Sequence, residues 1–285
     1  MNHLFCFGLG YTAKRLLTTF GHHKQDWSFS GTSRSEVSYE STKLHIFDDL
    51  LILPDDITHI LISVPPKETG DLVHSRFYAQ IARLKSLKWL GYLSSTGVYG
   101  DHKGGWVSEE SEVSLGSALG RSRLSAENQW LQALSDAIPT HIFRISGIYG
   151  PGRSALENVI SGKLKIIDKP DVVFSRIHVD DIVNALSLSI AKPNVGSIYN
   201  LADDYPCNSR EVNEFAYKLL GVAPPPPILL EDAELSEIGR EFYMQSRRVS
   251  NNKIKFELEL KLIYPTYKEG LISIAKECGY IAESI

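Results

Sequence analysis

The segment FCFGLGYTAKRL, residues 5–16, decides the fold. An apolar run typical of a β-strand ends at Gly8, and a helical pattern begins just after Gly10. In such a strand–turn–helix unit, the first glycine permits the tight turn and the second lets a pyrophosphate approach the backbone, while Ala13 lets the helix pack on the strand. A glycine turn with a purely steric role is the alternative. Because the helix N-terminus also offers free amides to phosphates, we favour the start of a dinucleotide-binding fold.

Strand-like and helical patterns alternate through the first two thirds of the chain. The strand-like runs are rich in β-branched or aromatic residues and read HLFCF, WSFSG, LHIF, HILISV, KWLGYLSS, THIFRIS and GSIYNLA. Amphipathic segments such as 71–87 and 117–137 lie between them. This alternation predicts βαβ units, and so an α/β fold with a Rossmann-type, doubly wound parallel sheet.

The pattern changes after about residue 203. A helical stretch at 209–220 runs into GVAPPPP, a stiff break, and a further helix is expected near 267–278. We therefore expect two parts. Residues 1–150 and 179–202 would form the dinucleotide-binding domain, and residues 151–178 and 203–285 a small, mixed C-terminal lobe that binds substrate.

Composition and charge limit the class of protein. The chain has 285 residues, of which 43% are hydrophobic and 22% charged, as in ordinary globular proteins. The net charge of −4, with no basic block, gives no basis for binding nucleic acid or an anionic membrane. Cys6, Cys207 and Cys278 are scattered and lack metal-ligand spacing, so we expect reduced thiols and no metal site. No secretion signal and no apolar run of about 18 residues is found, which predicts a cytoplasmic protein, either a monomer or a homodimer.

The end of the second predicted strand indicates which dinucleotide is bound. NAD-binding proteins usually carry an acidic residue there, whereas SGTSRS offers Ser33 and Arg34. Because an arginine suits a ribose 2′-phosphate, we expect NADP to be preferred over NAD, although a solvated arginine is the alternative. The predicted cofactor-binding residues are Gly8, Gly10, Tyr11, Thr12, Ala13, Ser33, Arg34, Asp48, Asp49, Ser63, Val64, Pro65 and Arg123.

Four later motifs together carry a family resemblance. They are YLSSTGVYG (92–100), FRISGIYGPGR (143–153), SRIHVDDIVNAL (175–186) and GSIYNLADDYP (196–206). In order and spacing they resemble the extended short-chain dehydrogenase/reductases, a superfamily that includes nucleotide-sugar epimerases and dehydratases. The resemblance covers nearly the whole chain. It is greatest to the atypical, NAD(P)-dependent epimerase/dehydratase-like subgroup, because the glycine motif is Gly-x-Gly-x-x-Ala and the usual catalytic Tyr and Lys are absent.

The resemblance assigns roles to several residues. Ser95 matches the catalytic Ser/Thr, which would hydrogen-bond the reacting oxygen. The alternative is that this serine, at the end of a strand, only hydrogen-bonds to the backbone of the following turn. In the HVDD stretch, the resemblance implies that Asp180 or Asp181 caps a helix rather than forming a catalytic pair with His178. On the substrate side the expected residues are Thr96, Tyr99, Tyr149, Arg153, Arg176 and Arg247, the arginines as candidates to meet phosphates.

Leu119 and Arg123 stand where the superfamily carries its Tyr-x-x-x-Lys pair. Leu119 can carry no proton, whereas Arg123 keeps a positive charge that could hold a ribose hydroxyl. A surface ion pair with Glu127, four residues on, is the alternative role for Arg123.

Three hypotheses for the function follow. The favoured one is an NAD(P)-dependent, epimerase-like oxidoreductase acting on a nucleotide sugar or similar polyol, with acid/base work moved to Tyr99, His102 or a bound water. The second is a catalytically silent NADP-binding sensor or scaffold. The third is a reductase of an activated small carbonyl compound, for which hydride transfer needs little acid assistance.

Overall fold

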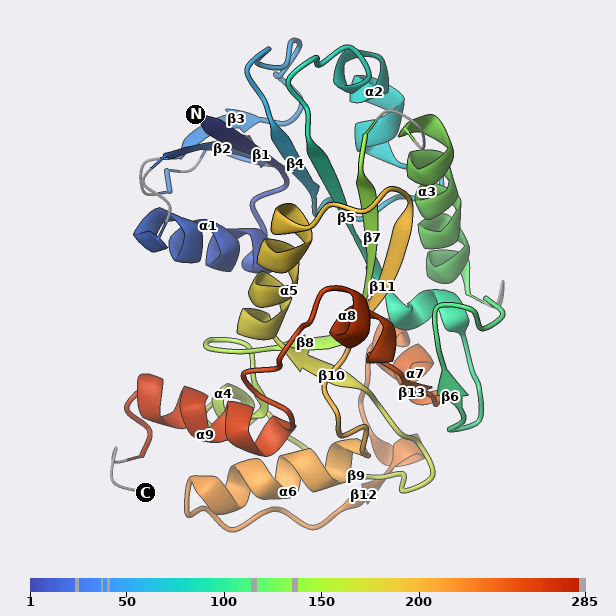
Figure 1. Ribbon diagram of the computed structural model, residues 1–285. Helices are drawn as coiled ribbons and strands as arrows, with labels where there is room; N and C mark the ends of the chain where they lie inside the picture. Colours follow the sequence, from blue (N-terminus) through green and yellow to red (C-terminus); the bar gives the residue numbers. More distant parts are fainter. Residues whose placement is uncertain (24–25, 37, 40–41, 114–116, 135–137, 282–285) are drawn as a thin grey trace. The chain divides into compact units, whose positions relative to one another are not determined.

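The fold is taken from a computed structural model that describes residues 1–285 except 24–25, 37, 40–41, 114–116, 135–137 and 282–285 (Figure 1). The described residues form two compact units. Unit 1 comprises 1–98, 113–144 and 182–199, and unit 2 comprises 99–112, 145–181 and 200–285.

A seven-stranded sheet forms the centre of unit 1, with strand order β11-β7-β5-β4-β1-β2-β3. The pairs β1–β2, β2–β3, β1–β4 and β4–β5 are parallel. From β1 the chain builds outward through β2 and β3, then returns to the other side of β1, which creates a switch point between β1 and β4. This confirms the doubly wound parallel sheet. The strands are β1 (Asn2–Phe7), β2 (Trp27–Ser33), β3 (Lys43–Ile46), β4 (His59–Ile62), β5 (Trp89–Ser95), β7 (Thr140–Ile145) and β11 (Ser197–Leu201).

Helices cover both faces of this sheet (Figure 1). Phe5, Ile60 and Leu90 lie in one core cluster with Phe77 of α2 and Trp130 of α3, so these two helices pack on one face. Because the strands are covered on both sides, their sequences read as near-continuous apolar runs. The helices are α1 (Tyr11–His23), α2 (Leu72–Ile81), α3 (Ala118–Leu134) and α5 (Val179–Ala191), with the 3₁₀ turn η1 (Thr96–Tyr99) after β5.

Unit 2 combines short strand pairs with helices around a second core. Tyr149 and Leu156 pack there with Tyr217, Leu271 and other apolar residues of the helices. Helix α9 approaches Tyr149 closely because residue 270 is glycine, since a Cβ at that position would lie 2.2 Å from the Tyr149 hydroxyl. The strand pairs are β8 (Gly147–Tyr149) with β10 (Arg176–His178), β9 (Ile167–Asp168) with β12 (Ile228–Leu229), and β6 (Trp106–Val107) with β13 (Arg248–Val249). The helices of this unit are α4 (Ala155–Ile160), α6 (Ser209–Leu219), η2 (Leu230–Asp232), α7 (Glu237–Tyr243), α8 (Asn252–Glu257) and α9 (Tyr267–Glu277).

In the part of the chain that the structure describes, every helix is too short or too polar to cross a membrane.

Candidate functional site

The glycine turn after β1 packs closely between the ends of β2 and β4. Gly8 has φ +85°, a backbone conformation that favours glycine. Its amide donates to Thr32 Oγ1 of β2 at 3.0 Å, and the hydroxyl of Ser63, which follows β4, donates to its carbonyl. A Cβ at Gly8 would lie only 2.9 Å from Val64 Cγ2. The turn therefore needs a glycine for both conformation and space.

Gly10 borders open space at the start of α1. A Cβ placed there would meet no heavy atom of the described residues within 4 Å, and the Gly10 carbonyl accepts the Lys14 amide at 2.9 Å. The amides of a helix's first turn have no acceptor within the helix, so they can bind a phosphate. Ala13, by contrast, is completely buried, as close helix–sheet packing requires. The turn thus has the shape and the donors that the pyrophosphate of a dinucleotide needs.

The remaining predicted cofactor residues of unit 1 follow neighbouring strands. Parallel strands bring their carboxyl ends to one edge, so these residues share the edge of the sheet that carries the glycine turn. Arg34 is exposed, and Asp48 is held by Arg76, which donates to its carbonyl oxygen at 2.7 Å. Ser33 and Arg34 lie at the end of β2, Asp48 and Asp49 after β3, and Ser63, Val64 and Pro65 after β4.

Ser95 is the last residue of β5, and Thr96 opens the 3₁₀ turn η1. The Ser95 hydroxyl oxygen accepts the amide of Gly97 at 3.1 Å. It therefore makes the turn contact expected of a strand-end serine. Because that bond occupies an acceptor position only, the hydroxyl proton is still able to donate to a substrate oxygen.

The start of α3 lies against this turn. A Cβ at Gly120 would be 3.1 Å from the Gly97 carbonyl oxygen, so the helix approaches closely only because residue 120 is glycine. The neighbouring Leu119 is 54% exposed. One turn later, Arg123 Nη1 donates to the carbonyl of Leu93 in β5 at 2.9 Å. Leu119 and Arg123 therefore lie on the part of α3 that borders the end of β5.

Glu127 is not the surface partner of Arg123 that the i,i+4 spacing suggested. It is 1% exposed and binds Arg144 of β7, with Arg144 Nη2 donating to Glu127 Oε2 at 2.8 Å. Arg144 Nε also donates to the same carboxylate, and the Ser94 hydroxyl donates to Glu127 Oε1. This buried network ties α3 to β5 and β7.

A cavity of about 460 Å³ in unit 2 is lined by three of the predicted substrate residues, Tyr149, Arg153 and Arg176. Phe174 and Phe242 also line this cavity, and their rings are stacked with centroids 4.1 Å apart. The Arg176 guanidinium donates to the carbonyl oxygen of Phe174 at 3.1 Å and to that of Cys207 at 3.2 Å. Burial keeps the pKa of the Tyr149 phenol well above its usual value.

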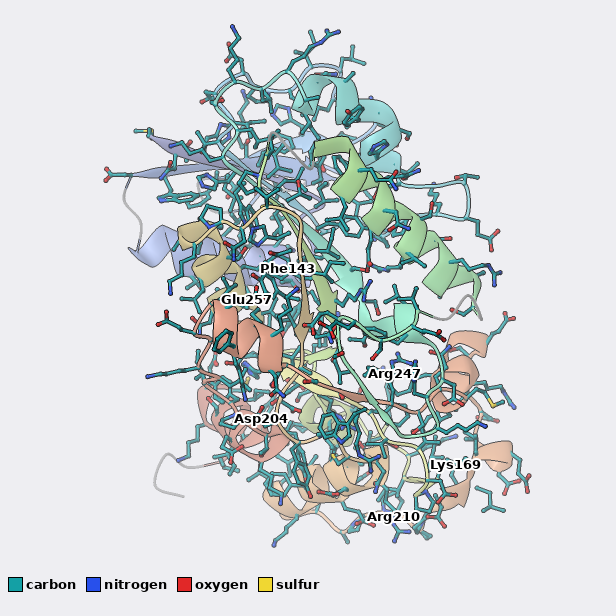
Figure 2. The ribbon with its side chains drawn as sticks, turned by 45° about the vertical axis from the view of Figure 1, so that its right-hand side comes forward. Phe143, Lys169, Asp204, Arg210, Arg247 and Glu257 are labelled. Carbon is teal, nitrogen blue, oxygen red and sulfur yellow. The ribbon has the colours of Figure 1, made fainter. Side chains whose placement is uncertain are left out.

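Two other predicted substrate residues make internal contacts within unit 2. Tyr99 is completely buried and donates to Asn200 Oδ1 at 2.7 Å. Arg247 (Figure 2) donates to the Gly100 carbonyl at 2.7 Å, and burial lowers its pKa to about 10. Neither residue is among those that line the 460 Å³ cavity. The remaining member of the set, Thr96, is buried in unit 1.

Of the two acids in the HVDD stretch, Asp181 has a structural role, whereas Asp180 Oδ2 lies 3.6 Å from His178 Nδ1, and neither acid is the helix cap. Helix α5 begins at Val179, so both Asp180 and Asp181 lie inside its first turn. The completely buried Asp181 carboxylate accepts the amides of Ile263 at 2.6 Å and Tyr264 at 3.2 Å. It thereby anchors the segment that leads into α9.

Sequence reasoning did not single out Asp203, which follows β11 and is 2% exposed. Its Oδ1 accepts the amide of Tyr205 at 3.1 Å, whereas Oδ2 has no hydrogen-bond partner among the described residues. Burial raises its pKa to about 8, so the carboxyl is mostly protonated at neutral pH. The only signal in the sequence is the acidic pair in LADDYP, which resembles an ordinary solvated turn.

Comparisons with known proteins agree with this fold. The model of the NAD-dependent epimerase/dehydratase family matches residues 78–202. A solved structure of a functionally unknown conserved protein from Silicibacter pomeroyi is 39% identical, with 98% of this chain and 99% of that one covered and a TM-score of 0.90. Protein YeeZ from Escherichia coli K12 is 25% identical over 244 residues, which are 76% of this chain and 84% of YeeZ.

The fold is also that of a nucleotide-sugar enzyme. UDP-glucuronic acid 4-epimerase from Bacillus cereus, solved with UDP-glucuronic acid and NAD, has a TM-score of 0.77 and 16% identity, with 98% of this chain and 100% of that one covered. Taken with the parallel sheet and the glycine turn at its switch point, these matches place the chain in a family: it belongs to the extended short-chain dehydrogenase/reductases, as an atypical, NAD-dependent epimerase/dehydratase-like member.

Proposed function

We propose that unit 1 binds NADP(H) in preference to NAD(H). The open space beside Gly10 at the start of α1, next to the close-packed turn at Gly8, supports binding of a dinucleotide. The preference for NADP rests on Arg34, which is exposed just after β2. The first-turn amides of α1 would hold the pyrophosphate, and Arg34 would pair with the ribose 2′-phosphate. When bound, the nicotinamide supplies the acceptor or donor of a hydride.

We further propose that the protein is an epimerase-like oxidoreductase and that its substrate is a nucleotide sugar or a similar polyol. The cavity of unit 2 supports this class of ligand, because it combines aromatic rings with Arg153 and Arg176. Aromatic rings can stack on the nucleobase of such a substrate, and guanidinium groups can bind its phosphates. In this proposal unit 2 is the substrate lobe.

At the end of β5, Ser95 would donate a hydrogen bond to the reacting oxygen of the substrate, a bond that strengthens as negative charge develops there. Arg123 would keep a positive charge close by, while Leu119 supplies no proton. Of the candidates considered as replacements, Tyr99 already donates its hydroxyl proton to Asn200, which leaves His102 and a bound water. His102 Nε2 lies 3.1 Å from the Tyr99 carbonyl oxygen.

Activity with nucleotide sugars and small carbonyl compounds tests the proposal. NADPH absorbance reports net reduction, and chromatography of the products reports a redox-neutral epimerisation. Ser95→Ala should lower turnover by about a hundredfold or more, with cofactor affinity nearly unchanged. Ser94→Ala is the matched control, because that hydroxyl binds Glu127 and its loss should reduce stability more than turnover. Turnover that survives Ser95→Ala would contradict this placement of the active site.

A catalytically silent, NADP-binding sensor is the second candidate, and Leu119 favours it because an alkyl side chain cannot transfer a proton. A sensor would show no turnover on any of the compounds, yet it would bind NADPH tightly and be stabilised by it.

A further inference from the structure

Another cavity of unit 2 combines an exposed tryptophan with polar side chains. Its volume is about 400 Å³, within the range of about 300–1,000 Å³ that is typical of small-molecule sites. No described residue lines both this cavity and the 460 Å³ cavity. The lining comes from β6, from the segment after β11, and from β13 through α8. It consists of Trp106, Asp203, Asp204, Val249, Ser250, Asn251, Asn252 and Lys255.

Trp106 is exposed because of its position on a short strand. It forms β6 with Val107, which pairs with Val249 of β13, and the Ser250 amide donates to the Val107 carbonyl at 2.8 Å. Successive side chains of a strand point to opposite faces. Val107 is 1% exposed in the core, so Trp106 points outward and is 62% exposed. An indole that is held by a paired strand but left uncovered offers a flat apolar face to a ligand.

Hydrogen bonds hold the polar part of the lining in place. Asn251 is 6% exposed, and its Nδ2 donates to the carbonyl of Ala202 and to Asp204 Oδ1, each at 2.8 Å. Lys255 Nζ donates to the same Oδ1 of Asp204 (Figure 2). A carboxylate accepts at both oxygens, so Oδ2 of this 41% exposed side chain is able to accept from a ligand. The exposed amide of Asn252 adds both a donor and an acceptor.

The residues that line this cavity carry no net charge at neutral pH. Asp204 and Lys255 form an ion pair, so their charges cancel. Asp203 is 2% exposed, and burial raises the pKa of its carboxyl to about 8, so it is mostly protonated and neutral. Its Oδ2 has no hydrogen-bond partner among the described residues. A phosphate or a metal cation would therefore gain little charge stabilisation here. Hydroxyl groups, which both donate and accept, match this lining.

We propose that this cavity binds a neutral sugar ring, at a site separate from the 460 Å³ cavity. A pyranose ring has C–H groups on its face and hydroxyl groups around its edge. It can therefore lie with its face on the Trp106 indole while its hydroxyls bond to Asp204 and Asn252. A protein partner fits less well, because the centre of a protein interface is usually poor in charged residues, and the apolar residues of this lining are Trp106 and Val249 alone among those described.

Binding of methyl glycosides tests the proposal. The panel comprises the methyl glycosides of glucose, galactose, mannose and N-acetylglucosamine, measured without NADPH by saturation-transfer NMR and isothermal titration. At least one should bind with a Kd of the order of 1 mM, as expected for a ligand of about a dozen non-hydrogen atoms. Trp106→Ala should raise that Kd by about tenfold or more, and Asn252→Ala by about threefold to tenfold. Both side chains are at the surface, so Tm should change little.

Phe256→Ala is the matched control. Phe256 is an aromatic residue of α8 that is 87% exposed but does not line the cavity, so its loss should leave the Kd unchanged. Absence of binding by every glycoside at about 20 mM, roughly twentyfold above the expected Kd, would overturn the proposal. Equal affinity in Trp106→Ala and the wild-type protein would also overturn it. So would a wild-type dimer that Trp106→Ala dissociates, because a protein surface would then cover the indole. None of these measurements needs cofactor or turnover, so their outcome is independent of the proposed function.

Discussion

Replacing Gly10 by alanine should separate cofactor binding from stability. Among the residues that the structure describes, the new Cβ would meet no heavy atom within 4 Å, so there is room for it. Alanine is a poorer N-cap than glycine, but it also reduces the entropy of the unfolded chain. These two effects partly cancel, and the free energy of unfolding should change by less than about 1 kcal/mol.

The substitution should instead weaken the binding of NADP(H). The added methyl group would occupy the space through which the pyrophosphate approaches the backbone, and it would displace the phosphates from the first-turn amides of α1. Losing one charge-assisted hydrogen bond costs roughly 1.5–3 kcal/mol. The Kd for NADPH should therefore rise by about tenfold to a hundredfold.

Isothermal titration with NADPH measures the affinity, and thermal unfolding without cofactor measures the stability. Gly196→Ala is the matched control: its φ is +69° and a Cβ there also meets open space, so it should lower Tm through backbone strain while NADPH affinity stays the same. Wild-type affinity in Gly10→Ala would refute the assignment of the pyrophosphate to this turn.

Three further predictions concern other positions. Arg34→Ala should weaken NADPH by about 1–3 kcal/mol and leave NADH nearly unchanged in the same titrations; equal losses for both would contradict a role at the 2′-phosphate. Glu127→Gln should lower the free energy of unfolding by about 3 kcal/mol in urea titrations, because it leaves Arg144 buried beside a neutral partner; a loss below about 1 kcal/mol would contradict this. For Asp203, whose pKa is raised to about 8, folding keeps a proton that the unfolded chain loses above about pH 4. The protonated Asp203 carboxyl therefore contributes fully to stability below about pH 4, and this contribution is lost as the pH rises to about 8. Asp203→Asn should flatten the decline of Tm over that range. An unaltered slope would show that another group causes the decline.

The sequence predicts the class of fold because its periodicities are local. The apolar runs of the strands alternate with amphipathic segments, and the helix expected near 267–278 is observed as α9, Tyr267–Glu277. The strand order depends on pairing between distant segments, such as β1 with β4, and a period of two residues carries no information on partners. The glycine turn predicts the doubly wound sheet as a class, because that turn is typical of it.

Side-chain roles are predicted less well, since long-range packing decides them. Glu127 lies four residues from Arg123, yet its carboxylate binds Arg144, 17 residues away in sequence, because β7 brings that arginine to the buried side of α3. The sequence places Arg247 among the candidates to meet substrate phosphates, and in the structure it donates to the carbonyl of Gly100 inside unit 2. Burial, rather than residue type, determines both roles.

The most direct test of the account is a crystal structure of the protein with NADPH. The account predicts that the pyrophosphate lies over Gly10 at the start of α1, that the 2′-phosphate pairs with Arg34, and that the nicotinamide lies near Ser95. A cofactor bound elsewhere, or a 2′-phosphate that points away from Arg34, would contradict it.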